Sequence, residues 1–258
     1  MTAMTRMPTL EEKADHLSTH AMLEHTATDA QLEARMDLLE AYFKTPLEGE
    51  DLLFNIGLYA RSGVLVKFLV MAELYKRFVN VPGILCEFGV WYGQNLVLLE
   101  NLRAIFEPFA KQRKIVGFDT FTGYPERKDG FYAAGESYKD YLAKLLKTHQ
   151  RMNVYGHQKI DHELVVGPVE KTVRPYFATH SESIVAFAYF DIGTYAPTYE
   201  ALRVIKNHLV PGSVLLLDQL TWAEEPGEAR AFRKVFGQDG YTIEKCALYP
   251  SKAIVTIR

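Results

Sequence analysis

The chain has 258 residues, 48% of them hydrophobic, and a formal net charge of −3. This length and composition suffice for a large core in one or two domains. The slightly negative charge excludes the basic surface by which proteins bind nucleic acids or anionic membranes, so neither partner is expected. No apolar stretch has the length of a transmembrane helix, and residues 1–7 lack the apolar region of a signal peptide. We therefore expect a cytoplasmic protein.

Two parts are expected along the chain. Residues 1–52 are rich in Glu, His, Thr and Ala, with sparse helical spacing of apolar residues between positions 32 and 43. They predict an N-terminal helical extension outside the main core. Residues 53–78 carry a regular apolar face and predict one long helix, which ends before Pro82 and Gly83. This helix begins the second part, residues 53–258.

From residue 84 onward, strand and helix patterns alternate. Strand patterns occupy residues 84–88, 114–119, 163–166, 184–191, 213–218, 242–247 and 253–257. Helical patterns occupy residues 96–110, 137–150, 169–176, 198–208 and 228–236. Such alternation indicates a mostly parallel sheet with helices on both faces. The two cysteines, Cys86 and Cys246, lie within apolar strand patterns and are expected to be buried free thiols.

The last two strand patterns are separated only by a short turn that contains Pro250, which predicts an antiparallel hairpin. Five strand–helix units closed by such a hairpin form the layout of class I methyltransferases, whereas nucleotide-binding Rossmann domains usually lack the hairpin. We therefore expect an α/β, Rossmann-like class I methyltransferase fold with a mostly parallel seven-stranded sheet.

An acidic residue and two glycines mark the end of the first strand, where Glu87, Gly89 and Gly93 form the pattern E-x-G-x-x-x-G. Asp119 ends the next strand, and α/β folds bind ligands at the edge where such strands end. The glycines let the backbone approach a cofactor, and Asp119 is placed to accept hydrogen bonds from ribose hydroxyls. Glu87 would repel a diphosphate but attract the sulfonium and ammonium groups of S-adenosylmethionine. The alternative is a tight turn whose glycines serve only packing.

Further residues complete the predicted cofactor site. Gln94 and Asn95 belong to the glycine turn, and Thr120 follows Asp119. Tyr59 and Arg61 begin the long helix before the core and are candidates for contacting a cofactor carboxylate. An ordinary surface arginine is an equally good interpretation of Arg61.

Two aspartates end later strand patterns, Asp191 in AFAYFD and Asp218 in SVLLLD, and Gln219 follows directly. All three should lie at the same edge as Glu87. Two carboxylates and a carbonyl oxygen suit Mg²⁺ or another hard divalent cation, which would lower the pKa of an acceptor hydroxyl. The alternative is that these acids cap neighbouring helices.

The loop after Asp218 contains Glu224, which is a candidate active-site base or substrate contact and equally well a solvated turn residue. Histidines such as His162 fall in or beside polar connecting segments, without zinc-binding spacing, and are expected to be exposed. No nucleophile elbow or P-loop pattern occurs, which excludes common hydrolase and NTPase interpretations.

The chain resembles the macrocin-type sugar O-methyltransferases, metal-dependent enzymes that methylate deoxysugars of antibiotics. The resemblance extends from about residue 55 to the C-terminus and rests on VPGILCEFGVWYGQN, VGFDTFTGYP, AYFDIGTYAPTYEAL, LVPGSVLLLDQL and EPGEARA. It implies that Asp191 and Asp218 bind the metal, with the next residue as third ligand. Related enzymes often carry an acidic residue at the position of Gln219. They also carry an acidic residue, proposed as the catalytic base, at the position of Gly193. Asp191, Glu224 or solvent must then take the proton.

The sequence thus predicts an S-adenosylmethionine-dependent, metal-assisted O-methyltransferase that acts on a hydroxyl of a nucleotide-linked deoxysugar in natural-product biosynthesis. A homo-oligomer is expected, because the N-terminal extension has too few apolar residues for a core of its own and is best buried against a neighbouring subunit; the alternative is burial against the active-site mouth. Two alternatives are a non-catalytic methyltransferase-fold scaffold, which Gly193 and Gln219 favour, and a nicotinamide-dependent oxidoreductase, which the absent G-x-G-x-x-G disfavours. The sugar, its hydroxyl, and the choice between a nucleotide sugar and a finished glycoside stay open.

Overall fold

The computed structural model of the chain describes residues 28–110, 112–123, 134–153, 162–221 and 227–258. The chain divides into two compact units, Met1–Val64 and Leu65–Arg258. The described part of the first unit contains helix α2 (Asp29–Phe43), helix α3 (Gly49–Phe54) and the 3₁₀ helix η2 (Ile56–Tyr59). None of these three elements has a buried residue. A capping box stabilises the start of α2, because the Thr28 and Gln31 side chains each accept a hydrogen bond from the other's backbone N–H.

The predicted single helix over residues 53–78 is wrong. Helix α3 ends at Phe54, η2 follows, and helix α4 (Ser62–Phe78) begins only after Ala60 in extended conformation. Asn55 ends α3, because its side-chain amide donates a 2.8 Å hydrogen bond to the Asp51 carbonyl oxygen. Side-chain amides that bind the backbone in this way compete with helix continuation, which the apolar spacing alone does not reveal.

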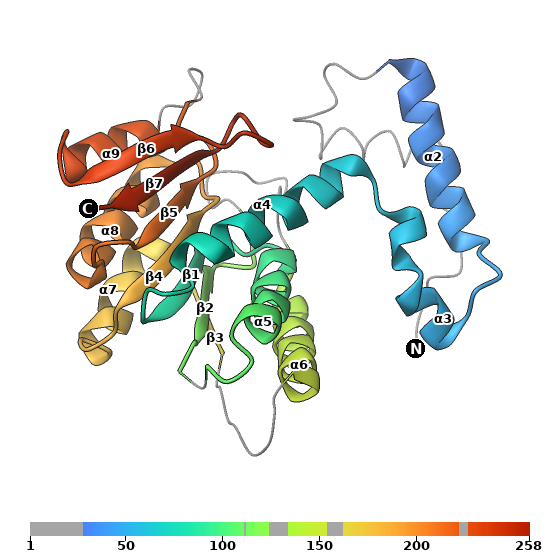
Figure 1. The fold of residues 1–258 in the computed structure, drawn as a ribbon, viewed down its shortest axis with the longest axis horizontal. Coiled ribbons are helices and arrows are strands. Elements are labelled where there is room, and N and C mark those ends of the chain that lie inside the picture. The colour runs from blue at the N-terminus through green and yellow to red at the C-terminus, as the bar shows by residue number, and fades with distance from the viewer. Residues whose placement is uncertain (1–27, 111, 124–133, 154–161, 222–226) are drawn as a thin grey trace. The chain divides into compact units, whose positions relative to one another are not determined.

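The second unit is built around one seven-stranded sheet. Its strands are β1 (Ile84–Phe88), β2 (Ile115–Asp119), β3 (Glu163–Val166), β4 (Val185–Phe190), β5 (Val214–Leu217), β6 (Tyr241–Lys245) and β7 (Ala253–Ile257). They lie in the order β3-β2-β1-β4-β5-β7-β6, in which β7 alone runs antiparallel to its neighbours β5 and β6. The seven strand patterns, the parallel sheet and the closing hairpin predicted from the sequence are therefore confirmed (Figure 1).

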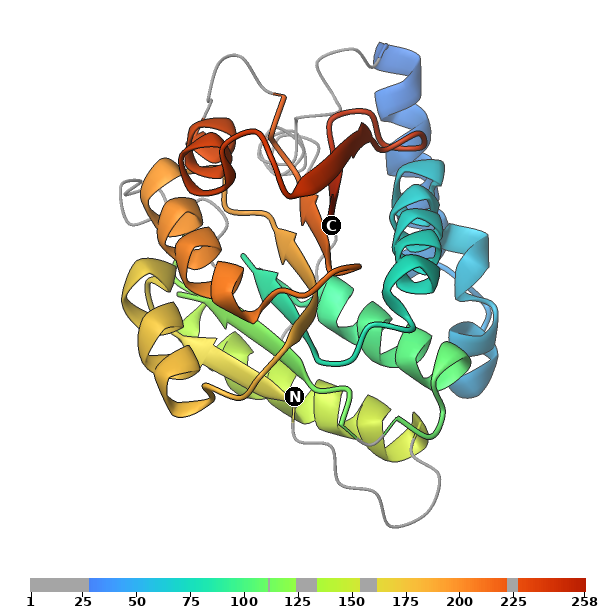
Figure 2. The same ribbon diagram turned by 60° about the vertical axis from the view of Figure 1, so that its left-hand side comes forward.

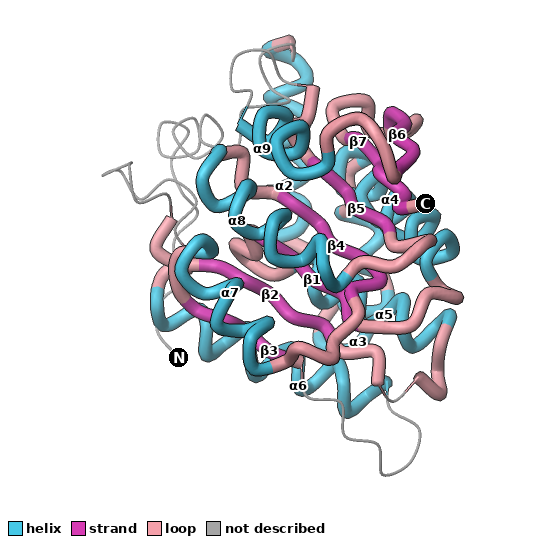
Figure 3. Tube along the Cα trace, turned by 90° about the vertical axis from the view of Figure 1, so that its left-hand side faces the viewer, coloured by secondary structure: helices cyan, strands magenta, loops and turns pink. Residues whose placement is uncertain are grey.

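Helices cover both faces of the sheet (Figure 3). The remaining helices are α5 (Gln94–Phe106), α6 (Glu136–Asn153), α7 (Val169–Thr179), α8 (Tyr195–Ile205) with η3 (Lys206–His208), and α9 (Gly227–Phe236). Buried side chains of α4, α5 and α6 form one core with the sheet, and those of α7, α8 and α9 form the other. Cys86 and Cys246 are free and buried, as predicted. No helix in the described ranges is long and apolar enough to cross a membrane.

The sheet register places the ends of the parallel strands side by side at one edge, which is the predicted ligand-binding edge. Backbone hydrogen bonds continue past the strand ends, from Asp191 N–H to the Phe88 carbonyl oxygen and from Asp218 N–H to the Phe190 carbonyl oxygen, at 2.9 and 3.1 Å. Because β7 is antiparallel, its first residue, Ala253, pairs with the last residue of β5. Figure 2 shows the red hairpin of β6 and β7 beside the orange strand β5. The start of β7 therefore lies at the same edge as the ends of the parallel strands.

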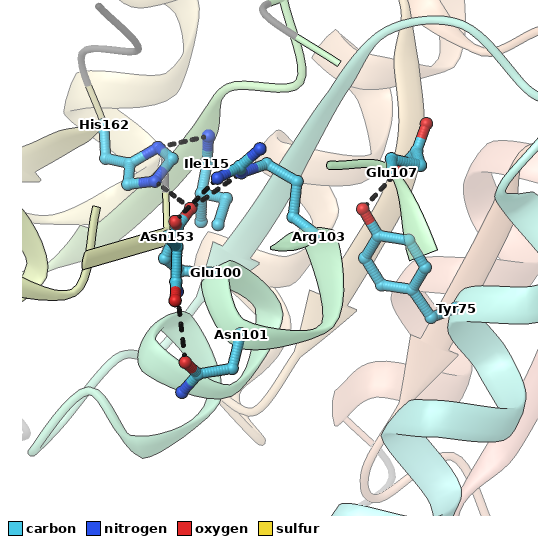
Figure 4. Close-up of polar contacts among 8 residues, drawn as sticks. All are labelled: Tyr75, Glu100, Asn101, Arg103, Glu107, Ile115, Asn153 and His162. Atoms are coloured by element: carbon cyan, nitrogen blue, oxygen red, sulfur yellow. Dashed lines mark hydrogen bonds and ion pairs between the residues drawn. The ribbon is translucent and has the colours of Figure 1, made fainter. Parts of the chain in front are cut away.

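A buried polar cluster holds α5 against β2 and β3 (Figure 4). The Arg103 guanidinium donates two 2.8 Å hydrogen bonds to Glu100, and both side chains are fully buried. His162 Nε2 lies 2.7 Å from Glu100 Oε2, and His162 Nδ1 accepts from the Ile115 N–H at 3.2 Å. The expectation that His162 is exposed is wrong, because both of its ring nitrogens are used inside the fold. Although burial opposes it, hydrogen bonding to Arg103 and His162 lowers the pKa of Glu100 to about 2.

Candidate active site

Glu87 lies near the end of β1 with only 1% of its surface exposed. Its Oε1 accepts a 2.7 Å hydrogen bond from the Asn95 side chain, while Oε2 is buried and has no hydrogen-bond partner among the described residues. Burial raises the pKa of this carboxyl well above its ordinary value, and Asn95 acts in the opposite direction. A buried acceptor without a donor fits a cationic or amino-bearing ligand, which is the chemistry expected for the methionine part of S-adenosylmethionine.

The two glycines of the turn after β1 have positive φ angles and close neighbours. Gly89 has φ +90°, and a Cβ there would lie 2.2 Å from the Asp191 carbonyl oxygen. Gly93 has φ +76°, and a Cβ there would lie 2.4 Å from the Leu142 side chain. Only glycine fits these positions, so packing requires both residues whether or not a cofactor also approaches them. Gln94 begins α5 and is exposed.

Asp119 ends β2 and orders the same turn. Its Oδ2 accepts hydrogen bonds from the backbone N–H groups of Val90 and Trp91 at 2.6 and 2.8 Å. Its Oδ1 accepts from the Phe121 N–H at 2.6 Å. A carboxylate has about four lone-pair sites, so three donors leave room for one further hydrogen bond without rearrangement. Neighbouring Thr120 donates to the Gly123 carbonyl oxygen at 3.0 Å and thereby stabilises the turn after β2.

The carboxylates of Asp191 and Asp218 approach the same hydroxyl group. Tyr189, in β4, is buried, and its phenol oxygen lies 2.9 Å from Asp218 Oδ1 and 3.3 Å from Asp191 Oδ2. A hydroxyl group has one proton, so it donates to one carboxylate at a time. The structure thus brings the two predicted acids together at the ends of β4 and β5. Burial, and then the charge of Asp191, raise the pKa of Tyr189 well above its ordinary value.

Lys252, directly before β7, supplies a positive charge to this group. Its ammonium forms an ion pair with Asp218 and donates a 2.7 Å hydrogen bond to the Tyr189 oxygen. Its side chain is only 6% exposed, and its nitrogen lies 4.5 Å from the centre of the Tyr249 ring. Burial lowers the pKa of Lys252 to about 8, against the opposing charge of Asp191.

Sequence reasoning missed both Lys252 and Tyr189. A signal for Lys252 was present, because the first residue of an antiparallel last strand lies at the edge where the parallel strands end. Tyr189 falls in the middle of an apolar run and gives no comparable signal.

Gln219 and Gly193 occupy adjoining space. Gly193 has φ +72°, and a Cβ there would lie 2.4 Å from Gln219 Oε1. This oxygen is buried and has no hydrogen-bond partner in the described part of the chain. The Gln219 N–H donates to Oε2 of Glu228, a fully buried residue of α9, at 2.8 Å. Burial raises the pKa of Glu228 to about 8, opposed by the backbone hydrogen bonds from Gln219 and Gly193.

The donor atoms near Asp218 fit a hard divalent cation in chemistry. Two carboxylates and the unpaired carbonyl oxygen of Gln219 are oxygen ligands of the kind that Mg²⁺ prefers. The described residues contain no group of three or more His, Cys, Asp and Glu side chains suited to a metal, so the third protein ligand would have to be an amide oxygen. The Lys252 ammonium already contacts Asp218, so any cation at this carboxylate meets a neighbouring positive charge.

Three predicted site residues fall in the first unit or outside the described residues. Tyr59 and Arg61 belong to the first unit, where the Tyr59 hydroxyl donates to Thr45 Oγ1 at 2.6 Å and its ring packs edge-on against Tyr42. Glu224 falls in residues 222–226, outside the described residues. The predicted roles of all three stay predictions.

Comparison with solved structures identifies close relatives. Two structures of CalS11 match: one of the calicheamicin methyltransferase with a TM-score of 0.83, and one of the apo TDP-rhamnose 3′-O-methyltransferase with a TM-score of 0.80. Both are 33% identical over 89% of this chain, which covers 93% and 95% of theirs. The O-methyltransferase NovP matches in fold, with 15% identity, a TM-score of 0.57, and coverage of 74% of this chain and 79% of NovP.

TomG from Streptomyces achromogenes, solved with SAM, also matches in fold, with 13% identity, a TM-score of 0.50, and coverage of 97% and 99%. No protein-family model matches the chain, and no curated protein sequence does.

The sheet with its hairpin, the site at its edge and the two CalS11 structures together define an S-adenosylmethionine-dependent O-methyltransferase. Because CalS11 shares 33% identity over 89% of the chain, the assignment can be made at family level. The chain belongs to the macrocin-type sugar O-methyltransferases.

Proposed function

We propose that this enzyme methylates a hydroxyl group of a nucleotide-linked deoxysugar in natural-product biosynthesis, with the help of a divalent cation. The relative CalS11 is a TDP-rhamnose 3′-O-methyltransferase of calicheamicin biosynthesis, which supports this substrate class. The observation that carries the proposal is that Asp191 and Asp218 meet at the Tyr189 hydroxyl. They do so directly beside the glycine turn after β1, where Gly89 lies against Asp191.

The residues around Glu87 are proposed to hold the cofactor. The unpaired Glu87 oxygen receives the amino group, with Asn95 fixing the carboxylate. The Asp119 carboxylate accepts a hydrogen bond from a ribose hydroxyl. It does so either with its remaining lone pair or in place of one of its three backbone N–H donors. When bound, S-adenosylmethionine supplies a methyl group that passes in line from sulfur to the acceptor oxygen, so positioning of these groups dominates catalysis.

Asp191, Asp218 and the Gln219 amide oxygen are proposed to hold the cation. A bound divalent ion would orient the sugar oxygens and lower the pKa of the acceptor hydroxyl. Asp191 is proposed as the base, because it is exposed at the strand edge and Gly193 cannot take a proton. Glu224 stays the alternative base.

Mass spectrometry tests the proposed reaction. The full-length enzyme is incubated with S-adenosylmethionine and a panel of nucleotide deoxysugars, their free sugars and finished glycosides. The proposal expects a product heavier by one CH₂ unit from a nucleotide sugar, with a smaller yield in EDTA that Mg²⁺ restores. Methylation of the glycosides alone would show that the enzyme acts after the sugar has been transferred to its final acceptor. Full activity in EDTA would remove the cation from the proposal.

A homo-oligomer is proposed on the basis of the first unit. Its short elements expose large apolar side chains, and Phe54 is 92% exposed. A second copy of the chain is the proposed cover for this surface, because a monomer rarely leaves such groups in water. Light scattering at micromolar concentration should show more than one subunit per particle, and Phe54→Ser should shift the distribution toward monomer. A monomeric wild type would exclude this assembly.

A further inference from the structure

Lys252 holds the position that a cation would need beside Asp218. Its ammonium pairs with the Asp218 carboxylate and donates to Tyr189, the same hydroxyl that both strand-end aspartates approach. The backbone fixes the residue, because the Lys252 N–H donates to the Tyr249 carbonyl oxygen and the Cys246 N–H donates to the Lys252 carbonyl oxygen, each at 2.9 Å. This ammonium is therefore part of the built site, not a surface charge.

We propose that Lys252 is a tethered counter-ion that competes with the divalent cation for Asp218 and so sets the metal affinity of the site. The inference rests on the proposed cation ligation by Asp218. In the metal-free enzyme, the positive charge of Lys252 offsets the repulsion between the two neighbouring carboxylates. A divalent ion can bind only when the ammonium leaves Asp218, since two positive charges at one partly buried carboxylate oxygen repel each other.

The side chain has the means to make this exchange. Lysine is a point charge on a flexible four-carbon stem, so its ammonium moves without moving the backbone. The Tyr249 ring lies within 4.5 Å of the nitrogen and offers a cation–π contact that does not depend on Asp218. Lys252 is accordingly a positioning residue for the cation and the carboxylates.

Manganese binding tests the inference without an activity assay. Mn²⁺ binding to the full-length protein is measured by electron paramagnetic resonance for the wild type, Lys252→Met and Lys252→Arg. The Met variant keeps most of the length of the side chain but loses its charge, and we expect it to bind Mn²⁺ about tenfold or more tightly than the wild type. The Arg variant keeps the charge and should gain no affinity. Lys206→Met is the matched control, because Lys206 contacts the Val235 carbonyl oxygen and lies in η3, away from the site.

Equal or weaker Mn²⁺ binding by a folded Lys252→Met protein would overturn the inference, as would a gain of the same size in Lys206→Met. If the Met variant does not fold, the rate of Lys252 acetylation in the wild type is measured by peptide mass mapping. Lys252 should be acetylated faster when Mn²⁺ is present. An unchanged rate would overturn the inference. S-adenosylhomocysteine binding and methyl transfer are measured separately, so failure of the counter-ion role is distinguishable from failure of the methyltransferase function.

Discussion

The Gln219 side chain occupies the space that a side chain at position 193 would need: a Cβ on Gly193 would lie 2.4 Å from the Gln219 amide oxygen. These are the two positions at which the resemblance to sugar O-methyltransferases led us to expect an acid. The missing acid at 193 leaves the space that the Gln219 carbonyl oxygen occupies. The two departures are therefore linked physically, and each should be interpreted together with the other.

Gly193→Ala should lower both stability and metal-dependent activity. The left-handed φ of +72° penalises a side chain by about 1–2 kcal/mol, and the new methyl group turns the Gln219 amide away from its site. Gln219→Ala removes the same oxygen directly. We therefore expect the double variant to lose no more kcat/KM than the worse single variant, measured at saturating Mg²⁺. Fully additive losses would show that the two residues act independently.

Glu87 and Asp119 should divide the recognition of the cofactor between its two halves. Glu87→Gln should weaken binding of S-adenosylhomocysteine by about 1.5–3 kcal/mol, because a charge-assisted hydrogen bond to the amino group is lost. The same variant should bind 5′-methylthioadenosine, which has no amino-acid part, as the wild type does. Asp119→Ala should weaken the binding of both ligands. Isothermal titration measures all four affinities, and an equal loss of both ligands in Glu87→Gln would contradict the assignment.

Asp218 should matter more for activity than Gln219. Asp218→Asn replaces a charged ligand by a neutral amide oxygen and leaves the buried Lys252 ammonium without its ion-pair partner, whereas Gln219→Ala removes one neutral oxygen. Gln219→Glu should bind Mg²⁺ more tightly if this side chain is a direct ligand. Steady-state kinetics over a Mg²⁺ series give both quantities. Full activity of Asp218→Asn in EDTA would refute a catalytic cation.

Glu100→Gln should destabilise the enzyme at neutral pH by about 3–5 kcal/mol, because it leaves the buried Arg103 guanidinium without its partner. The folded-state pKa of Glu100, about 2, lies below its ordinary value of 4.5. The stabilisation by the ionised carboxylate is therefore present above about pH 4.5 and is lost as the pH falls toward 2. Urea unfolding across pH should show the difference between wild type and variant shrinking in this window. A difference that is constant with pH would contradict the assignment.

Much of the sheet and its edge could be predicted from the sequence. Apolar runs that stop on an acid, as at Asp119, Asp191 and Asp218, mark both a strand and its end, because a buried strand tolerates few charges inside its run. The alternation of strands and helices then fixes which ends meet. The positions of the acids could therefore be predicted without knowledge of side-chain contacts.

The missed features depend on contacts between distant parts of the chain. The break between α3 and α4 comes from the Asn55 side chain bonding to the backbone, which an apolar spacing does not record. His162 is buried because Glu100, far from it in sequence, offers a partner. Lys252 reaches Asp218 because β7 runs antiparallel and brings its first residue to the edge where the parallel strands end.

The place of β7 within the sheet has a consequence for refolding. This strand follows the other six in sequence, yet it lies between β5 and the edge strand β6. A chain that has paired β1 to β5 already holds Glu87 and Asp119 in place, but it still lacks Lys252 beside Asp218 until β7 inserts. Recovery of cofactor binding after dilution from denaturant should therefore precede recovery of methyl transfer, and the interval between them reports the insertion of a single strand.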